Sequence, residues 1–160
     1  GQYTMTPKVE GRLLQSLALK TDDTVLEVGT GSGFLTACLS RLAKAIVSID
    51  IIAEFASDAR KKLDHLNIQN VELRTQDFFD LNENNQFDAI AITGSLPSIE
   101  ERFIQMLRPG GRMFVIIGQK PVMEAFLITQ NSHGKWMRES LFETVVAPLS
   151  NTTHHEPFVL

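Results

Sequence analysis

LEVGTGSGF, residues 26–34, places three glycines at alternate positions directly after an apolar run. The run TVLEV (24–28) has the composition of a buried strand, and GFLTACLSRLAK (33–44) has apolar residues at helical spacing. A glycine-rich turn between a strand and a helix lets backbone amides come close to a ligand. The stretch therefore predicts a cofactor-binding loop, and the residues around the glycines decide which cofactor it holds.

Strand-like and helix-like segments alternate along the rest of the chain. The expected helices are 7–19, 33–44, 53–67 and 98–107, the expected strands are 24–28, 45–49, 71–75, 87–93 and 112–118, and VMEAFLITQ with WMRESLFETVVAPL forms a closing hairpin. Near-continuous apolar strands separated by helices are typical of a parallel sheet covered on both faces. We predict an α/β fold: a Rossmann-like doubly wound sheet of five parallel strands plus a C-terminal antiparallel hairpin, in three α/β/α layers.

Length and composition favour one globular domain over residues 1–160, with an N-terminal arm and helix (1–20) and a tail (151–160). The net charge of −4 and the lack of a Lys/Arg run predict no nucleic-acid partner, and no segment suits a membrane span. The single cysteine, Cys38, excludes an internal disulfide and favours the cytoplasm. His154-His155-Glu156 is interpreted as a solvated part of the tail, so we expect no metal.

Two cofactors suit such a loop, a dinucleotide and S-adenosylmethionine. The dinucleotide pattern G-x-G-x-x-G needs glycine at position 34, but Phe34 stands there and the third glycine is Gly33. Glu27, two residues before Gly29, would repel a pyrophosphate and attract the ammonium and sulfonium groups of S-adenosylmethionine. The pattern Glu-x-Gly-x-Gly-x-Gly therefore favours S-adenosylmethionine over the NAD of an oxidoreductase.

Polar residues also follow other predicted strands, at the edge where a doubly wound sheet binds its ligands. Asp50 ends the second strand and is expected to accept hydrogen bonds from both ribose hydroxyls, with Ile51 and Ile52 against the adenine. Asp77 follows the third strand and can accept from the adenine amino group, with Phe78 covering the ring. The alternatives are that Asp77 caps a turn and that the apolar residues belong to the core.

These motifs resemble those of the class I S-adenosylmethionine-dependent methyltransferases, because LEVGTGSGF, SIDII, QFDAIAITG and LRPGGRMFVIIG occur in the same order and spacing. The flanking sequences resemble the protein-L-isoaspartate O-methyltransferase family over nearly the whole chain. The resemblance implies methylation of a carboxylate, such as that of L-isoaspartyl residues in damaged proteins. It assigns the methionine portion to Glu27, Gly29, Thr30, Gly31 and Gly33, the ribose to Asp50, the adenine end to Asp77, and the far wall to Thr93 and Gly94.

The acceptor side departs from the family pattern. The family's Thr-Ile-Ser reads Tyr3-Thr4-Met5, so a serine hydroxyl is missing, and Thr6 is the catalytic candidate to replace it. The family's alanine-rich stretch after the fourth strand reads Gly94-Ser95-Leu96-Pro97, and its N-terminal helical segment is absent. Thr4 and Ser95 are the other polar candidates. We expect these changes to affect the substrate more than the cofactor, with weak isoaspartyl activity or none.

No acid–base pair is expected for this chemistry. The thioether leaves as a neutral group, and a carboxylate acceptor is already ionised near neutral pH. The protein then acts by positioning and desolvation. Two other interpretations stay open: a methyltransferase of the same fold acting on another acceptor, and an S-adenosylmethionine-binding module without activity whose altered loops serve a partner.

Overall fold

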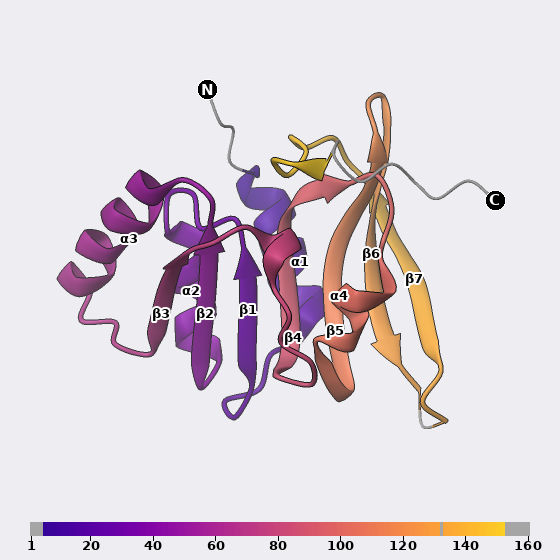
Figure 1. The fold of residues 1–160 in the computed structure, drawn as a ribbon, viewed down its shortest axis with the longest axis horizontal. Helices are drawn as coiled ribbons and strands as arrows, with labels where there is room; N and C mark the ends of the chain where they lie inside the picture. The colour runs from indigo at the N-terminus through magenta and orange to yellow at the C-terminus, as the bar shows by residue number, and fades with distance from the viewer. Residues whose placement is uncertain (1–4, 132, 153–160) are drawn as a thin grey trace.

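The computed structural model describes residues 5–131 and 133–152, which form a seven-stranded sheet with the order β3-β2-β1-β4-β5-β6-β7 (Figure 1). β1 to β5 run parallel, β6 pairs antiparallel with β5, and β7 pairs antiparallel with β6. The predicted five parallel strands with an antiparallel pair at one edge are therefore confirmed. The strands are β1 (Thr24–Val28), β2 (Ala45–Asp50), β3 (Val71–Thr75), β4 (Phe87–Leu96), β5 (Leu107–Gln119), β6 (Val122–Gln130) and β7 (Trp136–Glu143).

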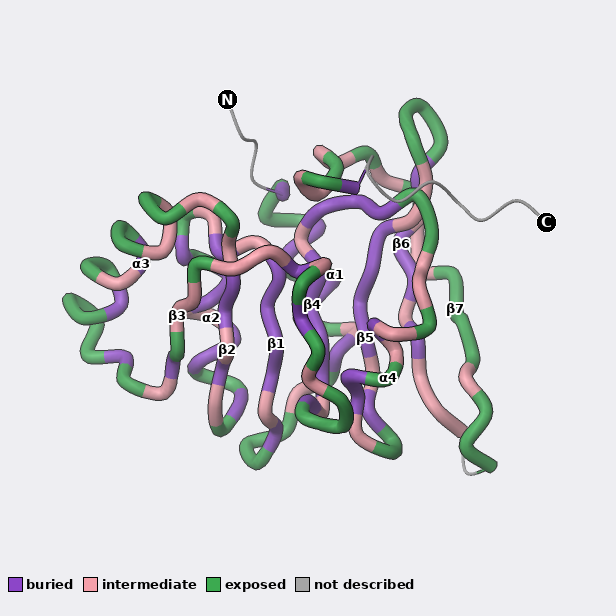
Figure 2. Tube along the Cα trace, viewed as in Figure 1, coloured by how far each residue is buried: buried purple, intermediate pink, exposed green. Residues whose placement is uncertain are grey.

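Three helices, α1 (Pro7–Leu17), α2 (Phe34–Leu42) and α3 (Ala53–His65), cover one face of the sheet. Leu13, Leu39 and Leu63, one from each helix, share a buried cluster with Val25 of β1. The next strand residue, Leu26, belongs to a second cluster, because neighbouring residues of a strand face opposite sides of the sheet. The central strands β1, β4 and β5 are buried from both sides (Figure 2).

Shorter elements cover the opposite face: the 3-10 turn η1 (Phe78–Asp80) and the helix α4 (Glu101–Gln105). Phe103 of α4 stacks on Phe78, with ring centroids 4.1 Å apart, and both rings belong to the same buried cluster as Leu26. The layer formed by η1 and α4 is therefore thinner than the layer formed by α1, α2 and α3. It still covers the second face of the sheet, as the three-layer prediction required.

α4 is shorter than the expected helix 98–107. Leu107 belongs to β5 instead, where it pairs with Phe87, and both side chains are buried. Sheet pairing and burial outweigh the modest helix propensity of one leucine. The segment 108–111, expected to separate the helix from the strand, lies within β5 as an irregularity in the pairing with β4, and Gly110 adopts a φ of 78° there.

Arg112 of β5 fixes α1 against the sheet. Its Nε donates to the Leu17 carbonyl at 2.6 Å, at the end of the helix, and its Nη2 donates to the Asp23 carboxylate at 2.6 Å. This ion pair is nearly buried on both sides, so a lost partner would leave a desolvated charge. The anchor sets the position of α1, which contributes residues to the site described below.

The chain returns over the end of β4 after leaving β7. Residues 147–150, the C-terminal strap, lie above β4 in the view of Figure 1. The Ser95 amide donates to the Ala147 carbonyl and the Leu149 amide donates to the Ser95 carbonyl, each at 3.0 Å. The strap thus roofs the edge of the sheet where the parallel strands end. Among the described residues, no helix is long and apolar enough to pass through a lipid bilayer.

Candidate functional site

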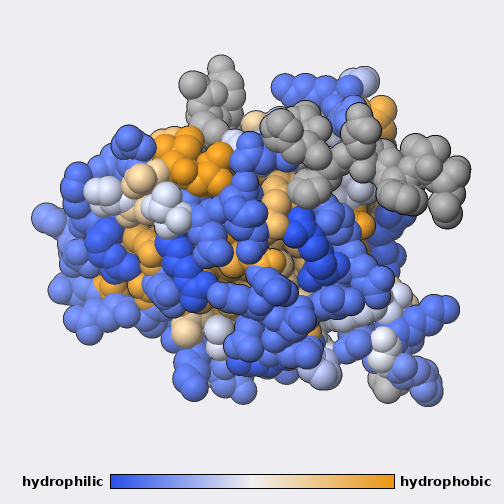
Figure 3. All heavy atoms as spheres, viewed as in Figure 1, coloured by the Kyte–Doolittle hydropathy of each residue, from blue (hydrophilic) through white to orange (hydrophobic). Residues whose placement is uncertain are grey.

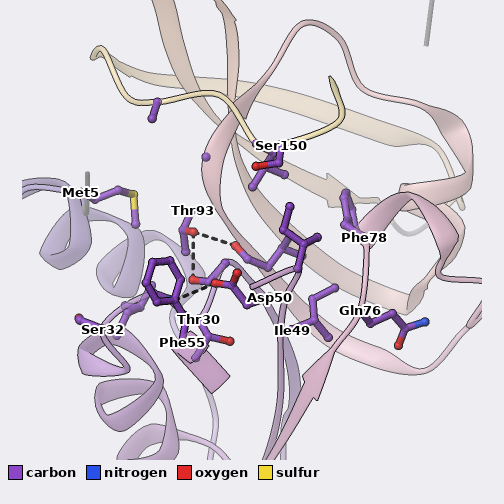
Figure 4. Close-up of a pocket in the computed structure, with 18 of the residues that line it drawn as sticks. Met5, Thr30, Ser32, Ile49, Asp50, Phe55, Gln76, Phe78, Thr93 and Ser150 are labelled. Carbon is purple, nitrogen blue, oxygen red and sulfur yellow. Dashed lines mark hydrogen bonds between the residues drawn. The ribbon is translucent and has the colours of Figure 1, made fainter. Parts of the chain in front are cut away.

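A cavity of about 340 Å³ lies at the carboxyl ends of β1, β2 and β4, below the strap (Figure 4). Its size falls within the ~300–1,000 Å³ usual for small-molecule sites. The wall comes from the glycine loop after β1, the ends of β2 and β4, the segment after β3, one side of α1 and α3, and the strap. This is the edge at which a doubly wound sheet binds its ligands.

The glycine loop has a backbone that other residues would not tolerate. Gly29, Gly31 and Gly33 have φ values of 95°, 49° and 79°, in the left-handed region. A Cβ at Gly29 would clash with Oγ1 of Thr93. That hydroxyl donates to the Val28 carbonyl at 2.8 Å and so ties the loop to β4. Gly29, Thr30 and Gly31 line the cavity, whereas Gly33 caps α2 outside it.

The Asp50 carboxylate is oriented by two backbone amides. Gly31 N–H donates to its Oδ2 and Ile52 N–H donates to its Oδ1, each at 3.0 Å. Each carboxylate oxygen keeps a free lone pair for a second donor. The half-buried side chain lies in the middle of the cavity (Figure 4), so it can accept from two hydroxyls of a ligand. Ile51, partly exposed, lines the same wall.

Asp77 both caps a turn and lines the cavity. Its Oδ1 accepts from Phe79 N–H at 2.9 Å, which caps η1, and its Oδ2 accepts from Asn151 Nδ2 at 2.6 Å. The turn-capping alternative is therefore confirmed, and any ligand must share this carboxylate with two protein donors. Phe78 likewise belongs to the core, stacked on Phe103, and lines the cavity beside Gln76 (Figure 4).

Glu27, expected beside the methionine portion of the cofactor, is not among the residues that line the cavity. Its neighbour Val28 is, so Glu27 points to the opposite side of β1, under α2. Its Oε2 accepts from Thr36 Oγ1 at 2.5 Å and from Ser48 Oγ at 2.6 Å. Burial, together with the nearby charges of Glu10 and Asp50, raises the pKa of Glu27 to about 7, although the two hydrogen bonds lower it. Glu27 therefore lies buried behind the cavity wall, between Thr36 and Ser48.

The remaining predicted residues are divided between the cavity and its surroundings. Thr93 and Gly94 line the cavity, as expected. Thr30 is buried, and its hydroxyl shares a hydrogen bond with Ser48 at 2.7 Å. Thr6 is exposed at the start of α1 and is not part of the lining, so the structure does not place its hydroxyl at a ligand. Ser95 is buried and serves the strap through its backbone.

Met5 lies at the end of the cavity where the acceptor-side arm begins. It is buried, and its side chain is on the opposite side of Asp50 from Phe78 (Figure 4). The apolar thioether therefore faces the ligand space. Thr4 and His154-His155-Glu156, discussed above, lie outside the described residues. Within the described ranges, no group of three His, Cys, Asp or Glu side chains could hold a metal ion.

Sequence reasoning missed Glu10 and the strap. Glu10 lines the cavity from α1, and burial raises its pKa. A signal was present, because Glu10, Leu13 and Leu17 have the i, i+3, i+7 spacing of one helix face, which is the buried face. Nothing in the sequence indicated that residues 147–150 lie at the cavity, since they carry neither a motif nor a periodic pattern.

The rim of the cavity is partly apolar. Ile51 is 39% exposed there, and Phe34, 59% exposed, follows the glycine loop. Figure 3 shows hydrophobic residues gathered near the upper edge of an otherwise hydrophilic face, above the end of β2. Apolar walls with a few oriented polar groups are typical of sites for small organic ligands.

Comparison with known protein families matches residues 1–154 to the family described as protein-L-isoaspartate(D-aspartate) O-methyltransferase. A protein-L-isoaspartate O-methyltransferase of Nitrobacter winogradskyi is 32% identical over 149 residues, covering 92% of this chain and 69% of the relative. Protein-L-isoaspartate O-methyltransferase 2 of Nitrosococcus oceani is 36% identical over 134 residues, covering 83% of this chain and 61% of the relative. The chain thus spans less than two thirds of the length of the second relative.

Two solved structures share the fold. One, named protein-L-isoaspartate O-methyltransferase, superposes with a TM-score of 0.80 at 24% identity, covering 91% of this chain and 48% of the other. The second, from Plasmodium falciparum, is described as a candidate protein-L-isoaspartate O-methyltransferase in complex with S-adenosyl-L-homocysteine. It superposes with a TM-score of 0.79 at 19% identity, covering 91% of this chain and 74% of the other. The likeness confirms the Rossmann-like doubly wound sheet.

Proposed function

Because the chain belongs to the protein-L-isoaspartate(D-aspartate) O-methyltransferase family, we propose that it binds S-adenosylmethionine in this cavity. We further propose that it methylates a carboxylate of a protein substrate, such as an L-isoaspartyl residue. The observation that carries the proposal is the Asp50 carboxylate, held by two backbone amides at the position where this sheet presents an acid to a ribose. The lone cysteine of the sequence supports a cytoplasmic location.

The charge of the cavity wall supports this cofactor over a dinucleotide. Among the described residues of the lining, Glu10, Asp50, Asp58 and Asp77 are acidic and Lys62 is basic. S-adenosylmethionine carries an ammonium and a sulfonium group against one carboxylate, whereas a dinucleotide carries an anionic pyrophosphate. An acidic wall stabilises the first and repels the second. These acids of the wall supply the negative charge that was expected from Glu27, which does not line the cavity.

The residues of the lining suggest how the cofactor would be held. Asp50 would accept from the ribose hydroxyls, and Phe78 with Ile51 would lie at the adenine end. Gly29 to Gly31 would face the methionine portion, with Thr93 closing the far wall. These assignments fit the cavity, because all of these residues line it. When bound, S-adenosylmethionine supplies an activated methyl group on a sulfonium.

The chain's own contribution to catalysis would be positioning and exclusion of water. The strap covers the cavity from β4, and Met5 and Leu35 present apolar surface to it. A carboxylate acceptor is ionised near neutral pH and needs no base. Holding it in line with the methyl group, in a site with little water, is the main requirement for transfer.

A second candidate is a methyltransferase of the same fold with a different acceptor, and Met5 favours it. The thioether of Met5 lines the cavity where the family pattern places a serine hydroxyl. An apolar group there gives an isoaspartyl carboxylate one hydrogen-bond donor fewer. The two candidates share the cofactor and differ only in the acceptor.

One experiment separates these possibilities. The chain is incubated with radiolabelled S-adenosylmethionine and either an isoaspartyl peptide or its aspartyl twin, and calorimetry measures binding of S-adenosylhomocysteine and NAD. Label in the isoaspartyl peptide alone supports the first proposal. Binding of S-adenosylhomocysteine without label transfer supports another acceptor or a module without activity. Binding of NAD without S-adenosylhomocysteine overturns the cofactor assignment.

A further inference from the structure

Glu10 is a carboxylate in the cavity wall that the proposed chemistry does not use. It is 9% exposed and lines the cavity with Met5 and Leu35. Within residues 5–131 and 133–152, its carboxylate makes no hydrogen bond or ion pair. The other acids of the lining differ, because Asp50 and Asp77 accept from protein donors and Asp58 pairs with Lys61.

A carboxylate in this place is unfavourable for the protein by itself. Leu13 and Leu17 share its helix face and are fully buried, so an apolar residue would suit the packing. Glu27 lies close enough for the two charges to repel each other. Lys62 is the basic residue of the described lining, and its ammonium group donates a hydrogen bond to the Ser32 carbonyl at 2.9 Å. A buried acid that lacks a protein cation is best explained by a cation on the ligand.

The position of Glu10 identifies the end of the ligand that it meets. Phe78 and Gln76 lie on one side of Asp50, and Met5 and Ser32 lie on the other (Figure 4). Glu10 lies on α1, which begins shortly after Met5, and it contributes to the wall together with Leu35 of α2. A ligand with its ribose at Asp50 and its base toward Phe78 directs its opposite end to Glu10. In an adenosyl amino acid, that end carries the α-ammonium.

We propose that Glu10 binds the α-ammonium of the cofactor's methionyl portion. The inference rests on the proposed function, since it requires an S-adenosylmethionine site. It assigns to α1 a binding role that the glycine loop does not provide, because the loop offers backbone groups and Glu27 is shut away beneath it. An ammonium on the methyl acceptor is the other possible source of the same chemistry, and binding in the absence of acceptor separates the two.

The test compares two ligands that differ by one group. S-adenosylhomocysteine carries the α-ammonium, and 5′-S-(3-carboxypropyl)-5′-thioadenosine is the same molecule with hydrogen in place of the amino group. Dissociation constants are measured by calorimetry at about pH 7, without acceptor, because an α-amino group is largely protonated there. We expect Glu10→Gln to weaken the binding of S-adenosylhomocysteine about 10- to 100-fold. The dissociation constant of the deamino analogue should change by no more than about twofold.

Two further variants control for folding and for charge. Glu10→Met keeps the size of the side chain and should show the same selective loss, even if Glu10→Gln folds poorly. Glu101→Gln makes the same chemical change at an exposed site of α4 and should change neither constant. Equal affinities of wild type and Glu10 variants for S-adenosylhomocysteine, or an equal loss for both ligands, overturn the inference. If neither ligand binds the wild type, the proposed function itself fails.

Discussion

At the scale of single residues, Asp50 is positioned by the backbone around it. Its oxygens accept from Gly31 and Ile52 amides, each at 3.0 Å, and keep lone pairs toward the cavity. We expect Asp50→Ala to weaken S-adenosylhomocysteine binding by roughly 1–3 kcal/mol, since charge-assisted hydrogen bonds to the ribose are lost. Calorimetry measures the change. Asp22→Ala, at an exposed position outside the cavity, is the control, and an unchanged constant for Asp50→Ala removes Asp50 from the site.

Met5 is the residue proposed to set the chemistry of the acceptor end. It is 8% exposed and presents a thioether to the cavity. We expect Met5→Ser to raise the rate of isoaspartyl methylation by about one to two decades, because a hydrogen bond to a charged group contributes about 1.5–3 kcal/mol. Initial rates with the labelled peptide give the answer. Met137→Ser, 56% exposed on β7, should change nothing. Ordinary rates in the unaltered chain, with no gain in Met5→Ser, would show that the missing hydroxyl is unimportant.

At the scale of secondary-structure elements, β4 and the strap pack closely against each other at the edge of the cavity. A Cβ at Gly94 would lie 2.9 Å from the Leu149 backbone nitrogen and 2.8 Å from its Cδ2. We expect Gly94→Ala to displace the strap and to weaken S-adenosylhomocysteine binding by about tenfold or more, with a lower melting temperature.

The control for this prediction is the same substitution in a helix. Gly11 lies in α1 with open space around its Cα, and its φ is ordinary. Gly11→Ala should stabilise the protein by about 0.5–1 kcal/mol through helix propensity. Calorimetry and thermal unfolding of both variants provide the comparison. A tightly bound strap in Gly94→Ala, seen as wild-type affinity and melting temperature, would contradict the proposed roof.

At the scale of the whole molecule, Glu27 links stability to pH. Its pKa in the folded protein is about 7, above the ordinary value of 4.5, because it is completely buried. The folded state therefore holds this proton more tightly than the unfolded chain. The stabilising contribution of protonated Glu27 is complete below about pH 4.5 and is lost as the pH rises through about 7.

Glu27→Gln removes this titration and keeps an oxygen to accept from Thr36 and Ser48. We expect the free energy of unfolding of the variant, relative to wild type, to increase by roughly 3 kcal/mol between about pH 5 and pH 8. Urea unfolding at a series of pH values measures it. Exposed carboxylates titrate equally in both proteins and cancel in the difference. Parallel stability curves would show that Glu27 titrates as an ordinary acid.

Much of this molecule could be predicted because its signals are local. The alternation of buried strands and amphipathic helices predicted the sheet, and VELRT at 71–75 matches β3 to the residue. The alternating glycines predicted a glycine-rich loop between a strand and a helix, and Gly29, Gly31 and Gly33 have positive φ values there. The position of Asp50 at the end of a parallel strand was enough to place it in the cavity, since all parallel strands of such a sheet end at one edge.

Tertiary structure decided what local pattern could not. The direction of the Glu27 side chain follows from which face of β1 meets α2, and a motif two residues before a glycine does not contain that information. α4 ends before the predicted residue because Leu107 pairs with Phe87 in the sheet, a contact between segments that are separated in the sequence. The strap and Glu10 reached the cavity through the packing of the last and first elements on the sheet. The sequence by itself therefore determined the fold class and the loop, whereas only packing between distant segments determined which charged groups face the ligand.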